Sequence, residues 1–183
     1  MMRLLTVGHG TLSAEEFIGL LHGARAARLI DIRSVPSSRH NPQFGRAEME
    51  RSLETAGVDY RWERALGGFR TPSPESPNTA LRHPAFRGYA DYMLTQEFAA
   101  AADELLGSAG TALTTVMCSE TVWWRCHRRL LSDYLTLVRG VEIQHLMHDA
   151  LLRQHRLTEG VRVVADHIVY DQVNLQPGAP SVG

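Results

Sequence analysis

The sequence is poor in cysteine, because Cys118 and Cys126 are the only two among 183 residues. Two cysteines so close together cannot build the disulfide framework of a small secreted domain. Reduced thiols in a reducing compartment fit this usage better. We therefore expect a cytoplasmic protein.

Long apolar runs are also missing from the chain. No stretch approaches the roughly 20 apolar residues that a membrane-spanning helix needs. The first apolar run ends at Gly8 and His9, without the extended hydrophobic region and small-residue cleavage site of a signal peptide. We expect no membrane partner and no removable leader.

The chain also lacks an excess of charge of either sign. Lys and Arg together number 19 against 20 Asp and Glu, which gives a formal net charge of -1. No global field therefore draws the protein to a nucleic acid, which stays a disfavoured alternative that would need arginines concentrated on one face. Recognition of a small anionic ligand must come from a local cluster of charges.

What the chain does contain is enough apolar material for a core, with 44% hydrophobic residues. We expect one domain over residues 1–176 and a flexible tail over 177–183, because no linker or internal repeat divides the chain. The sequence leaves a homodimer open.

Strand and helix patterns alternate along the chain. Apolar runs predict strands at 3–8, 27–33, 58–63, 111–117 and 140–147, and 3.6-residue periodicity predicts helices at 14–27, 46–57, 89–106 and 121–138. Ser13 and Glu16 form a capping box for the first helix, and Thr121 is the expected cap of the last. The alternation predicts an α/β fold: a mostly parallel open sheet with helices on both faces.

Two segments interrupt this pattern. Residues 64–88 hold four prolines together with Gly67, Gly68 and Gly88, which predicts a long proline-rich loop after the third strand, a lid or a mobile insertion. Residues 148–176 suggest a final hairpin or an edge strand.

Ionisable residues follow several of the predicted strands at the edge where open parallel sheets bind ligands. Asp31 and Arg33 lie on one face of the second strand, where they form a structural salt bridge or let Asp31 hold Arg33 toward a substrate anion. Arg39 and Arg70 lie in loops that we expect at the same edge. These arginines predict a phosphate or carboxylate pocket, with solvated loop charges as the competing interpretation.

The stretch VMCSETVWWRCHRR at 116–129 carries both cysteines. If a helix begins at Thr121, its N-terminus lowers the pKa of the Cys118 thiol and favours a nucleophilic thiolate. We interpret Cys126 as a buried apolar residue on that helix, and the seven residues between the cysteines argue against a zinc knuckle with His127. The sequence thus predicts no metal ligands, although a haem or a single metal ion held by one Cys or His leaves no spacing pattern.

Four blocks together resemble the family known as domain of unknown function 488: TVGHGTLS at 6–13, DIRSVPSSRHNPQF at 31–44, LGGFR at 66–70 and MCSETVWWRCHRRLLSDYL at 117–135. Gly10 stands where that family commonly has Ser, and Ile32 where it has Val. The resemblance implies a set of site residues without a settled reaction: His9, Asp31, Arg33, Arg39, Cys118, Glu120, His127 and Arg128.

We favour an enzyme, a cysteine-dependent transferase or hydrolase, acting on a phosphate- or carboxylate-bearing and nucleotide-like small molecule. The expected catalytic residues are Cys118, Glu120, His127 and Asp31, and the expected ligand-binding residues are His9, Arg33, Arg39, Arg70, Arg128 and Trp124. A non-catalytic nucleotide or nucleic-acid binding module is the alternative, and a haem or metal enzyme is the second. The cofactor is not determined by the sequence.

Overall fold

The computed structural model describes residues 2–172. Its strands are β1 (Arg3–Gly8), β2 (Arg28–Asp31), β3 (Asp59–Trp62), β4 (Thr114–Cys118), β5 (Glu142–Leu146), β6 (Leu152–Gln154), β7 (Val161–Val164) and β8 (His167–Tyr170). Its α-helices are α1 (Ala14–Gly23), α2 (Arg46–Thr55), α3 (Pro84–Tyr92), α4 (Gln96–Ala109) and α5 (Arg128–Leu137). The expected tail at 177–183 lies outside the described residues.

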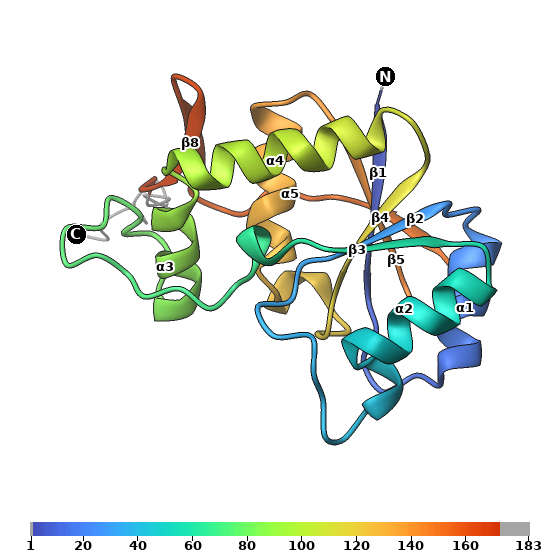
Figure 1. Ribbon diagram of the computed structural model, residues 1–183. Coiled ribbons are helices and arrows are strands. Elements are labelled where there is room, and N and C mark those ends of the chain that lie inside the picture. Colours follow the sequence, from blue (N-terminus) through green and yellow to red (C-terminus); the bar gives the residue numbers. More distant parts are fainter. Residues whose placement is uncertain (1, 173–183) are drawn as a thin grey trace, which may run out of the picture.

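The main sheet has the strand order β3-β2-β4-β1-β5-β6. Its first five strands are parallel, and β6 pairs antiparallel with β5 at one edge. Figure 1 shows α1 and α2 on one side of this sheet and α4 and α5 on the other. The expected α/β architecture with a mostly parallel sheet is confirmed.

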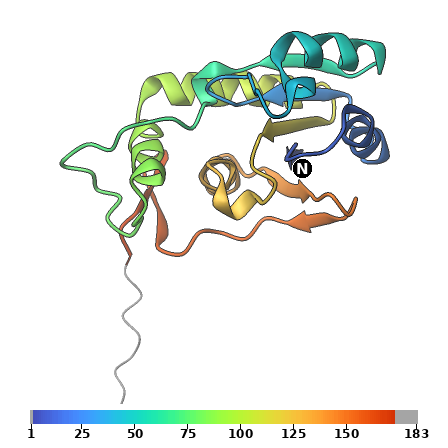
Figure 2. The same cartoon turned by 90° about the horizontal axis from the view of Figure 1, so that it is seen from below.

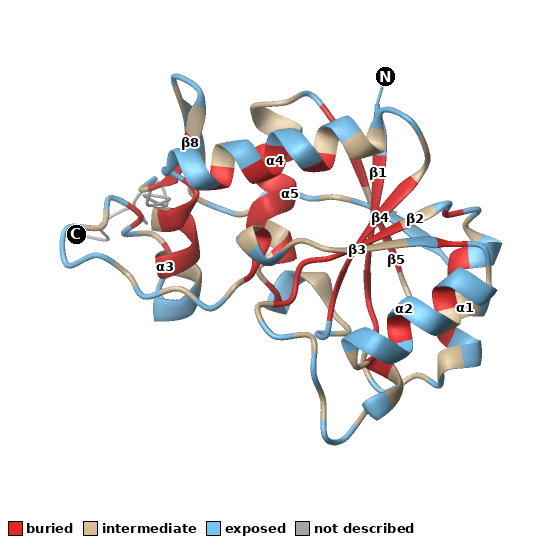
Figure 3. Cartoon of the chain, viewed as in Figure 1, coloured by how far each residue is buried: buried red, intermediate tan, exposed pale blue. Residues whose placement is uncertain are grey.

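Each face of the sheet has its own apolar core. Phe17 and Leu21 of α1 pack with Met49 and Leu53 of α2 on one face, whereas α3, α4 and α5 contribute to a larger core on the other. The central strands are therefore buried on both sides, as Figure 3 shows, which explains their near-continuous apolar sequences.

One helix expected over 89–106 is in fact two. Helix α3 begins at Pro84, inside the predicted loop, and ends at Tyr92, and α4 begins at Gln96. The Thr95 side chain accepts a hydrogen bond from the Phe98 N–H and caps α4. Proline at the first turn of a helix and threonine at its N-cap are both start signals, and the expectation of a single helix missed them.

The expected helix over 121–138 also differs from the structure. A 3-10 turn, Trp123–Arg125, comes first, Cys126 is extended with φ -125° and ψ 152°, and α5 begins only at Arg128. Thr121 therefore does not cap this helix. The apolar periodicity of the segment continued through a break in the backbone that periodicity alone does not reveal.

The segment after β5 forms the edge strand β6 and the separate hairpin β7-β8, so both expected arrangements occur. Figure 2 shows the hairpin beside α3, at the end of the molecule far from α1 and α2. A buried chain of hydrogen bonds anchors this region: His155 joins Asp133 of α5 (2.9 Å) and His145 of β5 (3.0 Å). Tyr170 of β8 donates to the same Asp133 (2.8 Å).

No helix within residues 2–172 is long and apolar enough to cross a bilayer.

Candidate functional site

A pocket of about 660 Å³ opens at the carboxyl ends of the central strands. The strand register explains its position, because Gly8 at the end of β1 lies beside Cys118 at the end of β4, and Asp31 at the end of β2 lies beside Met117. Residues that lie far apart in the sequence therefore meet there. The lining includes His9, Arg33, Cys118, Glu120, Cys126 and His127.

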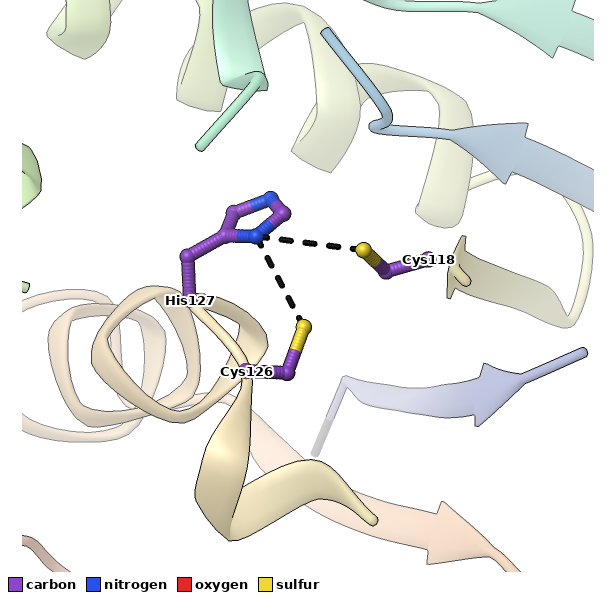
Figure 4. Close-up of side chains that lie close together, drawn as sticks. All are labelled: Cys118, Cys126 and His127. Carbon is purple, nitrogen blue, oxygen red and sulfur yellow. Dashed lines mark hydrogen bonds between the residues drawn. The ribbon is translucent and has the colours of Figure 1, made fainter. Parts of the chain in front are cut away.

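Two sulfurs and an imidazole form a cluster in the wall of this pocket (Figure 4). His127 Nδ1 lies 3.9 Å from Cys118 Sγ and 3.6 Å from Cys126 Sγ, and all three atoms lie within 4.8 Å of one another. The spacing argued against a zinc knuckle, yet the fold brings the three donor atoms together. The extended backbone at Cys126 turns its side chain toward β4 instead of along a helix face.

Cys126 is buried, as expected, but its surroundings are polar. Its sulfur accepts hydrogen bonds from the backbone N–H of Arg128 (3.5 Å) and from Arg128 Nε (3.4 Å). The Nη2 group of the same arginine donates to the Glu120 carbonyl. Arg128, which is 1% exposed, thus joins the Cys126 sulfur to the loop after β4 and does not project into the pocket.

The pKa values of the two thiols shift in the opposite way from the sequence-based expectation. Contact with Cys126, together with burial, raises the pKa of Cys118 well above its ordinary value. Burial alone would also raise the pKa of Cys126, but the hydrogen bond from Cys118 and the proximity of His127 and Arg128 lower it. The lowered pKa therefore belongs to Cys126, whereas the sequence analysis expected it at Cys118.

Asp31 and Arg33 form a buried ion pair at the end of β2. Arg33 Nε lies 2.9 Å and Nη2 2.6 Å from carboxylate oxygens of Asp31, and the Tyr60 hydroxyl donates to the same carboxylate (2.8 Å). The carboxylate is fully buried and does not line the pocket. Asp31 thus fixes the orientation of Arg33, and of the two residues only Arg33 lines the pocket.

His9 connects Arg33 to the first strand. Its Nδ1–H donates to the Gly10 carbonyl (2.8 Å), so Nε2 is left to accept a hydrogen bond from Arg33 Nη1 (3.3 Å). Its ring stacks on Phe44 with centroids 4.1 Å apart. Burial lowers the pKa of His9 to about 4, which keeps the imidazole neutral beside the guanidinium.

Besides Arg128, three other expected ligand-binding residues lie outside the pocket lining. Arg39 is exposed in the loop after β2. Arg70 stacks on Tyr92 at 3.5 Å and donates to backbone carbonyls of its own loop. Trp124 is 48% exposed and packs edge-on against Trp123. A position near the same edge of the sheet therefore did not bring these side chains into the pocket.

The site also depends on residues that the sequence analysis did not assign to it. Besides Cys126, these are Ser34, whose Oγ accepts from the Phe69 N–H (3.0 Å), and Gly8. The Leu-Gly-Gly block packs tightly: a Cβ at Gly67 would lie 2.6 Å from Ser34 Oγ, and one at Gly68 would lie 2.5 Å from His127 Nδ1. The adjacent glycines after the third strand are the sequence signal that indicates this close backbone approach.

A substitution at Gly8 tests the packing of the two strand ends. A Cβ at this position would lie 1.8 Å from the Glu120 carbonyl oxygen, so the loop after β4 must shift. We expect Gly8→Ala to lower the free energy of unfolding by about 1–3 kcal/mol, measured by urea denaturation.

The matched control is Gly19→Ala in α1, where an added Cβ meets nothing within 4 Å. That variant should raise stability by about 0.5–1 kcal/mol, because alanine favours a helix interior. Equal effects of the two changes would contradict the close packing of the strand ends.

The family model described as Domain of unknown function DUF488 matches residues 13–135. No curated protein matches the chain, and no solved structure matches it. The matched segment contains Arg33, both cysteines and His127, and it covers more than half of the chain. The chain therefore belongs to the DUF488 family.

Proposed function

We propose that this protein is an enzyme that binds a small phosphate- or carboxylate-bearing molecule in the sheet-edge pocket and acts on it with a nucleophile generated at the sulfur-imidazole cluster. The observation that carries the proposal is that Arg33 and the cluster of Cys118, Cys126 and His127 line one pocket of about 660 Å³. That volume suits a small molecule of nucleotide size. A cytoplasmic location is part of the same proposal.

Arg33 supports the anion-binding part. A guanidinium has five N–H donors; one at Nε and one at Nη2 go to Asp31, and one at Nη1 goes to His9. Two N–H groups remain without a hydrogen bond to the described residues. Asp31 already fixes the plane of the guanidinium. Binding of an anion therefore costs little additional conformational entropy at this side chain.

The cluster supports the chemical part. Sulfur is a strong nucleophile as a thiolate, and the N–H groups of Arg128 that contact Cys126 stabilise negative charge on that atom. Glu120 is exposed and lines the same pocket, so its carboxylate is available to accept a proton from a nucleophile or water. The reaction classes that fit are group transfer and hydrolysis.

Alkylation with an anionic electrophile tests the proposal. Iodoacetate is a carboxylate; a cysteine sulfur forms a bond to its methylene carbon, the carbon–iodine bond breaks, and iodide leaves. Iodoacetamide undergoes the same step without the charge. Relative to a free thiol, reduced and chelator-treated protein should favour iodoacetate over iodoacetamide by roughly tenfold, equivalent to about 1.4 kcal/mol in the transition state. Mass spectrometry of timed samples gives both rates.

Arg33→Met should abolish this preference, and Arg39→Met should keep it, because Arg39 is exposed outside the pocket. The two variants make the same change in net charge. A preference that survives Arg33→Met, or one that is absent from the parent protein, would refute the anion-directed site.

Nucleic-acid binding is less well supported. Arg39 and Arg70, which were expected to extend the positive surface, do not line the pocket with Arg33. A phosphate-backbone interface needs several such cations on one face.

A further inference from the structure

We infer that Cys118, Cys126 and His127 form a binding site for one thiophilic divalent cation, with zinc as the best fit, whose fourth coordination position opens into the pocket. The inference rests on the proposed function in one respect: it names the cofactor that would generate the nucleophile there. The metal site itself stands on geometry alone.

The two nitrogen–sulfur distances match tetrahedral zinc coordination. Zinc–sulfur bonds of about 2.3 Å and zinc–nitrogen bonds of about 2.0–2.1 Å place a sulfur and a nitrogen ligand about 3.6 Å apart. The structure gives 3.6 Å from His127 Nδ1 to Cys126 Sγ and 3.9 Å to Cys118 Sγ. These two distances need to change by only a few tenths of an ångström to admit the ion, and the two sulfurs lie within 4.8 Å of each other.

The chemistry of the donor set selects the class of metal. Two thiolates and an imidazole are soft and borderline ligands that suit zinc, whereas magnesium and calcium require oxygen. Two cysteines and one histidine with an open fourth position are also a ligand set of catalytic zinc sites. All three residues line the pocket, so a water or a substrate atom can reach that fourth position.

The surroundings hold the donors in place. The backbone N–H and Nε of Arg128 point at Cys126 Sγ, as outer hydrogen bonds do at thiolate ligands. The His127 ring lies close to the Gly68 backbone and makes a T-shaped contact with the Tyr89 ring, with the centroids 5.0 Å apart. Its Nδ1 is the nitrogen directed at the sulfurs, and its Nε2 is buried without a hydrogen-bond partner among the described residues.

Cobalt(II) provides the probe, because its visible spectrum reports tetrahedral geometry and its near-ultraviolet charge-transfer band reports thiolate ligands. Titration of the reduced full-length protein should give one Co²⁺ per chain with both signatures, and Zn²⁺ should displace it. Elemental analysis of the purified protein should find zinc. A parent protein that binds neither ion, or that binds Co²⁺ in an octahedral spectrum without thiolate bands, would overturn the inference.

Single variants assign the ligands. Cys118→Ser, Cys126→Ser and His127→Ala should each weaken Zn²⁺ binding by at least about 100-fold, since loss of an outer-shell partner alone costs 10- to 100-fold. His40→Gln, which alters an exposed histidine outside the pocket lining, should bind like the parent. Unchanged affinity in the three ligand variants would place the ion elsewhere and refute the site.

If a variant fails to fold, the parent protein still decides the question. Zn²⁺ should slow alkylation of Cys118 and Cys126 together by at least tenfold, and a chelator should restore the rate. Fast alkylation at saturating Zn²⁺ would refute ligation. Failure of metal binding with an intact iodoacetate preference leaves the proposed function standing on a thiolate nucleophile, whereas metal binding without that preference removes the anion-binding proposal only.

Discussion

Asp31→Ala is expected to lower the free energy of unfolding by about 3–5 kcal/mol, the cost of removing one member of a buried ion pair. Arg33 is only 6% exposed, and its side chain donates three hydrogen bonds to the Asp31 carboxylate. Without that carboxylate the guanidinium remains buried and unpaired, and the Tyr60 hydroxyl loses its acceptor. Urea denaturation monitored by circular dichroism measures the change.

The double variant Asp31→Ala with Arg33→Met separates the lost pairing from the lost packing. Removing both charges should recover at least about 1 kcal/mol of the single-variant loss, because the unpaired buried cation is gone. The iodoacetate preference should nevertheless stay absent, since Arg33 is missing. If the double variant is as unstable as the sum of the two single variants, the pair does not act as a unit and the positioning role of Asp31 is wrong.

Mild acid is expected to destabilise the protein strongly, by about 4–5 kcal/mol between pH 6.5 and 4.5 from two histidines. Burial lowers the pKa of His9 to about 4 and that of His145 to about 2. In the unfolded chain both rings take up a proton near pH 6.5, while in the folded protein they stay neutral. Their contribution to stability is therefore complete above pH 6.5 and is lost progressively as the pH falls through that value.

The groups facing His145 explain why it stays neutral. Burial is the largest cause, and His155 and Arg128 add to it, with Cys126 acting weakly in the opposite direction. The Thr6 hydroxyl lies 2.7 Å from Nδ1 and His155 Nδ1 lies 3.0 Å from Nε2. This chain of hydrogen bonds is satisfied with neutral rings, and a second proton on His145 would break it.

The groups facing His9 act in a similar way. After burial and the opposing hydrogen bond to the Gly10 carbonyl, Arg33 lowers its pKa, Asp31 raises it, and Arg128 adds a smaller lowering. A proton at Nε2 would confront the Arg33 guanidinium 3.3 Å away.

Denaturation curves at several pH values test the assignment. Each histidine contributes a slope of about 1.4 kcal/mol per pH unit below pH 6.5. His145→Gln and His9→Gln should each remove about that much of the slope, whatever they do to stability at pH 7.5, and His40→Gln should remove none. A slope unchanged in both buried-site variants would show that other groups cause the acid sensitivity.

Much of the site was predictable because strand ends can be recognised in the sequence. The apolar runs located the ends of β1, β2 and β4, and the parallel order of the sheet required His9, Arg33 and Cys118 to meet. The prediction was less successful for loop residues such as Arg39 and Arg70. Their positions depend on how each loop leaves the sheet, and a residue type alone carries no information about that direction.

The cluster of two sulfurs and one imidazole could not be predicted from the sequence pattern either. The 3.6-residue periodicity predicted one helix over residues 121–138 and placed Cys126 on its apolar face. The break at Cys126, with α5 starting at Arg128, turned this sulfur toward Cys118 and moved the expected low pKa from one cysteine to the other. Hydrophobic periodicity averages over a whole segment, so it does not register one extended residue within it.

The amino-acid sequence by itself determined the α/β class, the capping box of α1, the pairing of Asp31 with Arg33 and the edge of the sheet where ionisable residues gather. These follow from local patterns: periodicity, caps and the alternation of strands with helices. Only the tertiary structure decided which charged groups share the pocket, which of the two thiols has the lowered pKa and that three donor atoms lie within 4.8 Å of one another. Those properties depend on separations of a few ångströms between segments far apart in the chain, and they are fixed by packing across the sheet edge.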